Sequence, residues 1–327
     1  MISDHIHRLG ACLLMLGVAV WGCTTTEVPT QNNTPTTSFY EWSPSPSIDT
    51  KWIQAYQPQH IYIKALDFAY TKGLALSKTP IPELTQTKFV PVVFIDHRLL
   101  AKYPIARFLE VITDSLSAAK YPHIQLDCDW TLSTKTMYFE LLNILSKHYA
   151  KLSVTIRLHQ IKFYKTTGVP PVQRGVLMYY NMSDLKDFKT RNYILDLDVG
   201  KQYHVNFDTY PLPLDLGLPL YRQARVFLHE QLVGLVDFEG LKMQYLKHMS
   251  TEDATLWTVT QPHYAGGDFL YAGDQLKIDR VELPELISAV KSLRSLMSPK
   301  ELIFFDRRST HYFKSDELKQ LSALFGD

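Results

Sequence analysis

The chain is poor in cysteine and carries no excess of charge of either sign. Cysteine occurs only at positions 12, 23 and 128 of the 327 residues. Thirty-four Lys and Arg residues against 33 Asp and Glu residues leave a formal charge of +1, so the chain lacks the basic surface that a nucleic-acid partner needs. Its 14 glycines and 18 prolines are spread along the whole length, which excludes collagen-like and low-complexity classes.

Several short motifs of catalysis and cofactor binding are also absent. No glycine-rich phosphate loop follows the first predicted strand, so nothing supports a dinucleotide site. No His-Glu-x-x-His or paired-cysteine spacing occurs, although Asp127, Asp129, His97 and His159 could in principle converge. The Gly-x-Ser-x-Gly elbow of many serine hydrolases is missing as well. We therefore predict no metal ion and no cofactor.

Apolar material, in contrast, is plentiful. Hydrophobic residues make up 46% of the chain and aromatic residues 12%, which excludes wholesale disorder and predicts a globular body. Cys128 is the only cysteine beyond position 23, so the body contains no intrachain disulfide. It alternates with Ile124, Leu126 and Trp130, which predicts a buried structural thiol.

The first residues have the pattern of an export signal. His5, His7 and Arg8 precede an apolar run at 9–20 that is too short to span a bilayer comfortably. The run ends in Val-Trp-Gly-Cys, which resembles a bacterial lipobox. We therefore predict a signal peptide over residues 1–22 and lipid attachment at Cys23. The alternative is an ordinary signal peptide in which this cysteine is incidental.

A flexible tether is expected after the cysteine. Residues 23–37 consist largely of Thr, Pro, Asn and Gln and cannot bury enough apolar surface to fold. Thr24 stands where an Asp would resemble an inner-membrane retention signal. For a Gram-negative cell we therefore predict an exported, lipid-anchored protein of the cell envelope, held in the outer membrane through Cys23.

Residues 38–327 alternate between strand-like and helix-like segments, which is the signature of βα units. Eight segments rich in β-branched and aromatic residues are predicted strands: 38–42, 60–68, 88–96, 123–130, 152–158, 175–182, 214–221 and 301–306. Predicted helices cover 48–56, 105–120 and 133–150, the last capped by Ser133. Eight strands with helices between them, in a chain of this length, predict an α/β fold, a (β/α)8 TIM barrel. An open doubly wound sheet is the alternative.

The spacing changes after the seventh predicted strand, where an insertion occupies about 222–300. It contains a hairpin-like stretch at 224–238, a short helix at 241–248, a strand at 256–260, an aromatic loop at 262–273 and a helix at 283–297. A long connection after a barrel strand lies over the C-terminal mouth, where TIM-barrel sites are built. The insertion therefore either walls a pocket or packs on the outside.

The strand at 123–130 carries the clearest chemical signal. Its side chains alternate between two faces, so Asp127 and Asp129 share the face opposite Leu126 and Cys128 and should point toward the barrel axis. Two neighbouring carboxylates cost less free energy in a polar ligand site than in an apolar core. We therefore favour a ligand site at this position. The alternative is a buried network in which Arg157, from the end of the next strand, neutralises both.

Two motifs resemble signatures of glycoside hydrolase family 18, the chitinase-like barrels. Leu-Asp-Cys-Asp-Trp-Thr at 126–131 resembles the Asp-x-Asp-Trp-Glu signature of the family's fourth strand, and Met-Tyr-Tyr-Asn at 178–181 resembles the Met-x-Tyr-Asp signature of its sixth. The resemblance implies catalytic positions at Asp127 and Asp129, and substrate-binding positions at Tyr180, Met178 and Asn181. The layout also resembles a family of bacterial lipoproteins with glycosidase-like barrels, which brings no established activity.

Both motifs depart from the family pattern. The family's proton donor, a Glu, falls at Thr131, whose hydroxyl cannot protonate a glycosidic oxygen at neutral pH. Its Asp after the tyrosine is Asn181, and its first aspartate is Ile124. Three functions follow: a barrel that binds a glycan without cutting it, a hydrolase with a recruited acid, or a rigid surface for a protein partner. The recruited acid would be one of Asp129, Glu41, Glu230 and Asp306.

Other residues near the ends of predicted strands complete the candidate site. Arg157 and Trp42 are expected to contact the carbohydrate ligand, Trp42 by stacking on a sugar ring, and Glu41 and Asp306 to line the same mouth. Further aromatic candidates for stacking are Tyr70, Tyr179 and Tyr221. Asp67, Asp96 and His97 end the second and third strands and either line this mouth or cap turns and helices.

Overall fold

The computed structural model describes residues 34–84, 87–237, 247–253, 255–265 and 267–326, which belong to one compact unit beginning at Asn33. The predicted signal peptide, Cys23 and most of the tether lie outside the described residues. Thr36 and Thr37, which the sequence places in the tether, already form the start of the first strand.

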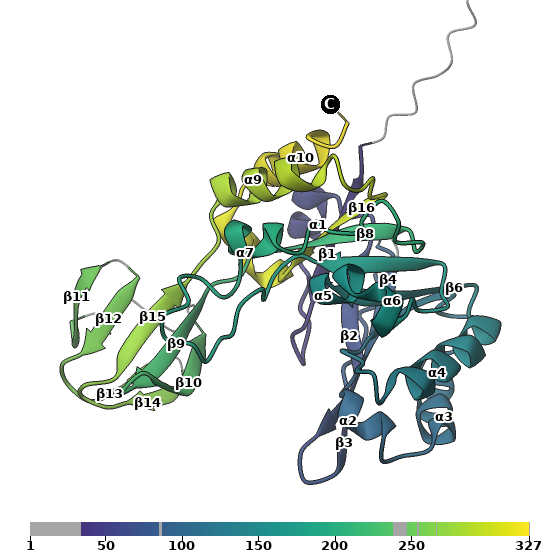
Figure 1. Ribbon diagram of the computed structural model, residues 1–327, viewed down its shortest axis with the longest axis horizontal. Coiled ribbons are helices and arrows are strands. Elements are labelled where there is room, and N and C mark those ends of the chain that lie inside the picture. Colours follow the sequence, from purple (N-terminus) through teal and green to yellow (C-terminus); the bar gives the residue numbers. More distant parts are fainter. Residues whose placement is uncertain (1–33, 85–86, 238–246, 254, 266, 327) are drawn as a thin grey trace, which may run out of the picture. The chain divides into compact units, whose positions relative to one another are not determined.

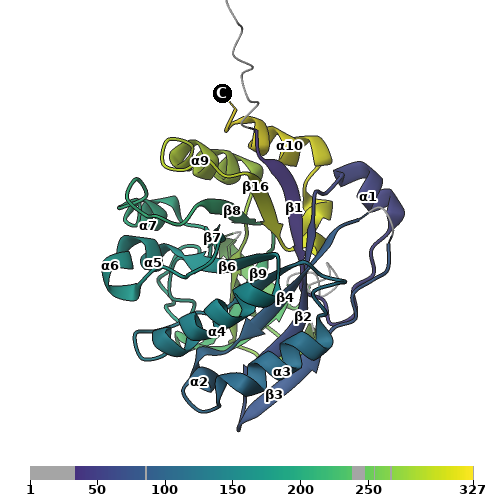
Figure 2. The same ribbon diagram turned by 90° about the vertical axis from the view of Figure 1, so that its right-hand side faces the viewer.

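Eight parallel strands form a closed barrel, which confirms the predicted TIM barrel (Figures 1 and 2). The order around the barrel is β1, β2, β4, β5, β6, β7, β8 and β16, and β16 pairs with β1 to close it. All eight barrel strands fall on the eight predicted segments. Their bounds are Thr36–Glu41, Ile61–Tyr70, Phe89–Ile95, His123–Asp127, Lys151–Arg157, Arg174–Met178, Leu214–Pro219 and Glu301–Phe305.

The barrel strands are buried on both faces, as expected of a parallel sheet covered by helices. In β5 the side chains of Ile124 and Leu126 are inaccessible to solvent and lie in the main hydrophobic core. Gln125, on the opposite face of the strand, accepts a hydrogen bond from the Tyr40 hydroxyl of β1 at 2.8 Å. The predicted alternation of apolar and polar residues in this strand is therefore confirmed.

Helices surround the strands (Figure 2). Their bounds, in the order α1–α7, α9, η2 and α10, are Thr50–Tyr56, His97–Leu100, Ile105–Ser115, Lys135–His148, Leu158–Lys162, Tyr164–Thr167, Leu197–Lys201, Leu283–Leu293, Arg307–Tyr312 and Ser315–Ala323. No helix in the described ranges is long and apolar enough to cross a bilayer.

The predicted N-cap at Ser133 is wrong. Helix α4 begins at Lys135, and its cap residue Thr134 makes no side-chain capping bond. Thr134 instead accepts a hydrogen bond from the backbone N–H of Thr131 at 3.0 Å, and the hydroxyls of Thr131 and Ser133 lie 2.9 Å apart. These bonds fold residues 131–134 into a turn before the helix, because short hydroxyl side chains compete for local backbone groups.

The insertion after the seventh barrel strand, β8, is a small antiparallel unit with its own core. Five strands pair in the order β10, β9, β15, β12 and β11, with bounds Gln231–Asp237, Gln223–Leu228, Gln275–Asp279, Leu256–Val259 and Met249–Asp253. The predicted aromatic loop forms a hairpin of β13, His263–Ala265, and β14, Asp268–Leu270. Most of the predicted helix at 241–248 lies outside the described residues.

Besides β13 and β14, three strands of five residues each went unpredicted, because none of them contains more than three apolar residues. They are β3, Leu74–Lys78, which pairs antiparallel with β2, and β11 and β15 of the insertion. In β15, Lys277 lies between Leu276 and Ile278 and donates hydrogen bonds to the carbonyls of Phe188 and Thr190. Because Lys277 has this role in the tertiary structure, the apolar residues of β15 alone do not identify the strand.

Arg225 of β9, which forms a buried ion pair with Asp279 of β15, fixes the insertion to the connection between β7 and β8. The Arg225 guanidinium donates to Asp279 through Nε at 2.6 Å and Nη2 at 3.1 Å, and both side chains are inaccessible or nearly so. Arg225 also donates to the backbone carbonyls of Leu185, Asp187 and Thr190. The insertion therefore packs against the segment that follows the sixth barrel strand.

Candidate functional site

A hollow of about 440 Å³ opens at the C-terminal mouth of the barrel, beside the ends of β5, β6 and β7. We call it the mouth hollow. It is lined by Asp129, Trp130, Thr131, Arg157, Leu158, His159, Met178, Tyr180, Asn181, Met182 and Tyr203. The structure thus brings together five of the predicted site residues, because parallel strands end at the same edge of the barrel.

Asp129 and Arg157 form an ion pair at the edge of the mouth hollow. Arg157 Nε lies 2.6 Å and Nη2 3.2 Å from the two carboxylate oxygens of Asp129. The Asp129 side chain is 51% exposed and that of Arg157 24%. Burial lowers the pKa of Arg157, but the charges of Asp129 and Asp127 outweigh it and raise this pKa above its usual value. The pair presents donors and acceptors to any molecule in the hollow.

Asp127 lies deeper, inside the barrel, and does not line the mouth hollow. Its carboxylate is 1% exposed and accepts a hydrogen bond from the Thr155 hydroxyl at 2.6 Å. Burial raises the pKa of Asp127, although the nearby charge of Arg157 opposes the shift. The expectation that both acids open into the mouth is therefore wrong for Asp127. Strand β5 ends at Asp127, so only Asp129, beyond the strand end, reaches the solvent.

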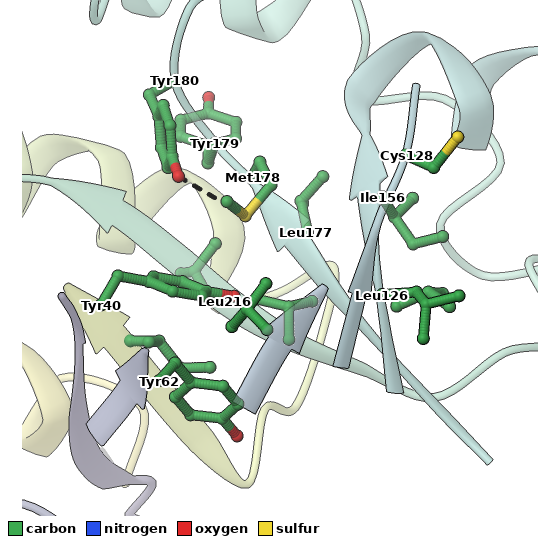
Figure 3. Packing of buried hydrophobic residues seen from close by; sticks show 14 of the residues in the cluster. Tyr40, Tyr62, Leu126, Cys128, Ile156, Leu177, Met178, Tyr179, Tyr180 and Leu216 are labelled. Atoms are coloured by element: carbon green, nitrogen blue, oxygen red, sulfur yellow. Dashed lines mark hydrogen bonds between the residues drawn. The ribbon is translucent and has the colours of Figure 1, made fainter. Parts of the chain in front are cut away.

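Tyr180 and Met178 line the hollow together, as the family motif implies. The Tyr180 hydroxyl points at the sulfur of Met178, 3.6 Å away (Figure 3). The Tyr180 ring stacks on Phe305 with ring centres 5.5 Å apart, and burial raises the pKa of its hydroxyl. Asn181 is exposed, has a positive φ of 55° and accepts a hydrogen bond from the Tyr221 hydroxyl. Its side-chain oxygen is thereby held at Tyr221.

Glu41 and Asp306 are buried carboxylates that each pair with an arginine, and neither lines the mouth hollow. Glu41 is inaccessible, pairs with Arg307 and accepts a hydrogen bond from the backbone N–H of Ser43 at 2.8 Å. Asp306 is 3% exposed and accepts hydrogen bonds from Nε and the backbone N–H of Arg308 at 2.7 and 2.9 Å. Both carboxylates are committed to holding the segment after β16 in place.

Trp42 is partly buried among aromatic rings at the end of β1. Its ring centre lies 5.3 Å from that of Phe305 and 6.3 Å from that of Phe94, and Lys64 Nζ lies 4.9 Å from the Trp42 ring. The indole N–H is buried and has no hydrogen-bond partner among the described residues. Such unpaired buried donors are uncommon, and a ligand or water can satisfy them.

A second hollow, of about 340 Å³, lies on the other side of Asp129. It is lined by Phe94, Ile95, Asp96, His97, Arg98 and Asp129. Asp96 both lines this side hollow and caps α2, accepting a hydrogen bond from the Arg98 N–H at 3.0 Å. Arg98 also donates from its side chain and holds the pKa of Asp96 below its usual value. Asp129 thus separates two adjoining hollows at the mouth.

Among the described residues, no proton donor takes the place of the missing family Glu within the mouth hollow. Thr131 lines the hollow with a hydroxyl that already bonds Ser133 and Thr134, and Asp129 is the one carboxylate among these lining residues. Glu230 lies in the exposed turn between β9 and β10 of the insertion, with a positive φ of 62°. In the part of 222–300 that the structure describes, no residue lines the mouth hollow or the side hollow.

Sequence reasoning missed several residues that shape the site. Phe305 packs against Trp42, Tyr180 and Tyr221 and joins these three rings into one aromatic cluster beside the mouth hollow. His159, which the sequence named only as a possible metal ligand, lines the mouth hollow from α5, and Met182 and Tyr203 line it from the connection after β7. The position of Phe305 at the end of the last barrel strand was a usable signal; the loop residues gave none. Within the described part of the chain, no group of three or more His, Cys, Asp or Glu residues is placed to hold a metal ion.

The fold is similar to those of solved family 18 chitinases. A chitinase from Chromobacterium violaceum is 9% identical, with 89% of this chain and 98% of that chain covered and a TM-score of 0.54. A family 18 chitinase from Cycas revoluta, solved with (GlcNAc)4, is 13% identical over 88% of this chain and 98% of that chain, with a TM-score of 0.53. The spore cortex-lytic enzyme SleL of Bacillus megaterium is 8% identical over 89% and 74%, with a TM-score of 0.53.

No protein-family model matches the chain, and no curated protein matches it in sequence. The likeness is therefore one of fold. It agrees with the distant resemblance that the motifs at 126–131 and 178–181 indicate.

Proposed function

We propose that the protein binds a carbohydrate in the mouth hollow and does not hydrolyse it. The observation that carries this proposal is the composition of that hollow: an exposed ion pair, Asp129 with Arg157, beside the ring of Tyr180 and the exposed amide of Asn181. A sugar ring offers hydroxyls to the polar groups and an apolar face to the aromatic ring. The hollow lies where TIM barrels carry their sites.

Three features favour binding over hydrolysis. Glycosidases need one carboxyl group that protonates the leaving oxygen, and Thr131 stands at the position that the family motif assigns to it. The Asp129 carboxylate is held by Arg157, and Asp127 is sealed below the mouth with Thr155. The remaining acid next to Asp129, Asp96, has a lowered pKa because of Arg98 and is a poor proton donor.

The test is titration of the purified protein with a panel of oligosaccharides that includes (GlcNAc)4. We expect saturable binding of one glycan class and no release of reducing ends. Tyr180→Ala and Asp129→Ala should each weaken binding about tenfold or more, which corresponds to about 1.4 kcal/mol. Tyr180→Phe keeps the ring on Phe305 and loses only the contact with the Met178 sulfur, so it should bind nearly as well as the wild type.

Asp268→Ala, on the exposed hairpin of the insertion, is the control and should bind like the wild type. Release of reducing ends that Asp129→Asn stops would establish a hydrolase instead. Neither binding nor release, together with a protein partner captured by mild crosslinking, would favour the protein-interaction function.

The proposed cellular place of the barrel is the envelope of a Gram-negative cell, held through a lipid on Cys23. The pattern at 9–23 and the polar composition of 24–35 support this proposal. An envelope or environmental glycan is then the ligand within reach of the mouth.

A further inference from the structure

A third hollow lies at the opposite, N-terminal end of the barrel. We call it the floor hollow. Its volume is about 750 Å³, and it opens beside the first residues of β2, β4 and β5. It is lined by His60, Ile81, Pro82, Glu83, Leu84, Thr87, Lys88, Phe89, Val90, Lys120, Tyr121, Pro122 and His123. The N-terminal end of a TIM barrel normally serves stability, so a hollow of this size there needs an explanation.

The walls of the floor hollow are mainly apolar. Ile81, Leu84, Phe89 and Tyr121 are half-buried around it, and Val90 is buried at its inner side. Small-molecule sites are typically concave, mostly apolar and between about 300 and 1,000 Å³, with a few placed polar groups. The floor hollow has this character.

One polar group at the inner end is His60, which a buried carboxylate holds in place. Its Nδ1 lies 2.6 Å from Glu301 Oε1, and Glu301 also accepts hydrogen bonds from Tyr62 at 2.8 Å and from Ser38. Burial alone would raise the pKa of Glu301, but these donors hold it below the usual value. Because the ionised carboxylate only accepts, Nδ1 of His60 carries the proton toward Glu301.

The other ring nitrogen of His60, Nε2, has no hydrogen-bond partner within the described residues. It is the edge of the imidazole opposite Glu301, and the side chain is 18% exposed and lines the hollow. A carboxyl group suits this nitrogen in either protonation state of the ring. A carboxylate accepts from a protonated Nε2, and a carboxylic acid donates to an unprotonated one.

A second imidazole and two lysines complete the polar part of the floor hollow. The His123 ring centre lies 6.1 Å from that of His60, and its Nε2 lies 3.0 Å from the Ser153 hydroxyl. Burial lowers the pKa of His123 to about 3, so this ring is neutral. At the rim, Lys120 pairs with Glu83 at 3.0 Å, and Lys88 adds a further positive charge. The rim therefore carries a net positive charge, which attracts an anionic ligand to the entrance of the hollow.

We propose that the floor hollow binds an amphipathic carboxylic acid, with its carboxyl group at His60 Nε2 and its apolar body against Leu84, Phe89 and Tyr121. This site is separate from the mouth hollow and does not depend on the carbohydrate proposal.

The test is calorimetric titration of the full chain with octanoate and, as an apolar match without the carboxyl group, 1-octanol. We expect saturable binding of octanoate that is about tenfold tighter than that of 1-octanol. His60→Gln keeps an N–H toward Glu301 but lacks the ring nitrogen, so it should weaken octanoate about tenfold and leave 1-octanol unchanged. Leu84→Asp places a carboxylate in the wall and should weaken both ligands about tenfold.

The matched control is Leu132→Asp, the same change at a leucine that is 61% exposed near the other end of the barrel. It should bind both ligands like the wild type. Leu84→Asp lies away from Glu301, so it decides the matter if His60→Gln fails to fold. Absence of saturable octanoate binding, or binding that survives Leu84→Asp, overturns the proposal. Equal binding of octanoate and 1-octanol overturns the assignment of the carboxyl group.

Discussion

At the scale of single residues, Asp127 and Asp129 are two positions apart but lie in different environments. Asp127 is the last residue of β5 and is sealed against Thr155 inside the barrel, whereas Asp129 is half exposed and pairs with Arg157. Alternation places both on the same face, but it holds only while the strand continues. The residue pattern identified the two acids. The end of β5 determines which of them is exposed to solvent.

The buried carboxyl of Asp127 predicts a specific dependence of stability on pH. Its pKa is raised in the folded state, so above about pH 4 the unfolded chain releases this proton first and the free energy of unfolding falls. The fall continues until the pH passes the pKa of the folded state, and each pH unit in that interval costs about 1.4 kcal/mol. Asp127→Asn cannot ionise, so the difference in unfolding free energy, variant minus wild type, should grow more positive with pH.

Urea denaturation between pH 4 and 8 measures this difference. Thr155→Val is the control: it removes the hydroxyl that bonds Asp127 but leaves the carboxyl, so its stability should still fall with pH. A difference between Asp127→Asn and the wild type that stays constant across this range would contradict the prediction.

At the scale of elements, the barrel strands were predictable and the strands of the insertion were less so. Barrel strands are buried on both faces and read as compact runs of β-branched and aromatic residues. Strand β15, in contrast, alternates apolar residues with Lys277, whose charge is satisfied by backbone carbonyls of a distant segment. Helix ends were also uncertain, because local bonds among Thr131, Ser133 and Thr134 moved the start of α4.

The buried ion pair between β9 and β15 should be essential to the stability of the insertion. Asp279→Ala leaves the Arg225 guanidinium buried without its carboxylate partner, and breaking a buried pair in this way typically costs about 3–5 kcal/mol. Glu83→Ala breaks the solvent-exposed pair with Lys120 and should lower the free energy of unfolding far less, because water screens exposed ion pairs. Urea denaturation of both variants compares the two costs. Equal losses of unfolding free energy in the two variants would show that another residue or water compensates the Arg225 charge.

At the scale of the whole molecule, the closed barrel separates two kinds of hollow. The mouth hollow and the side hollow share Asp129 at the C-terminal end, whereas the floor hollow lies between the starts of β2, β4 and β5. The described part of the insertion has its own small core and packs on the segment after β7 rather than lining the mouth hollow or the side hollow. The two proposed ligands therefore have separate sites, and each can be tested without the other.

Lipid anchoring through Cys23 is a prediction about the whole molecule in its cell. In a Gram-negative host, the wild type should fractionate with membranes and incorporate labelled palmitate, because the chain after the cleaved signal would carry acyl groups. Cys23→Ala removes the acceptor and should abolish both. Cys128→Ala, which changes a buried thiol of the barrel, is the control and should keep them. Equal membrane association of Cys23→Ala and the wild type would show that the cysteine is incidental.

The sequence by itself determined the barrel, its eight strands, the place of the insertion and five of the residues that line the mouth hollow. Periodicity and strand order carry this information, because parallel strands must bury both faces and end together at one edge. Only the tertiary structure decided that Asp127, Glu41 and Asp306 are sealed, that Arg157 holds Asp129, and that His60 and His123 meet across a hollow at the floor. Burial and ion pairing depend on residues distant in the chain, such as Glu301 beside His60, and no local pattern contains them.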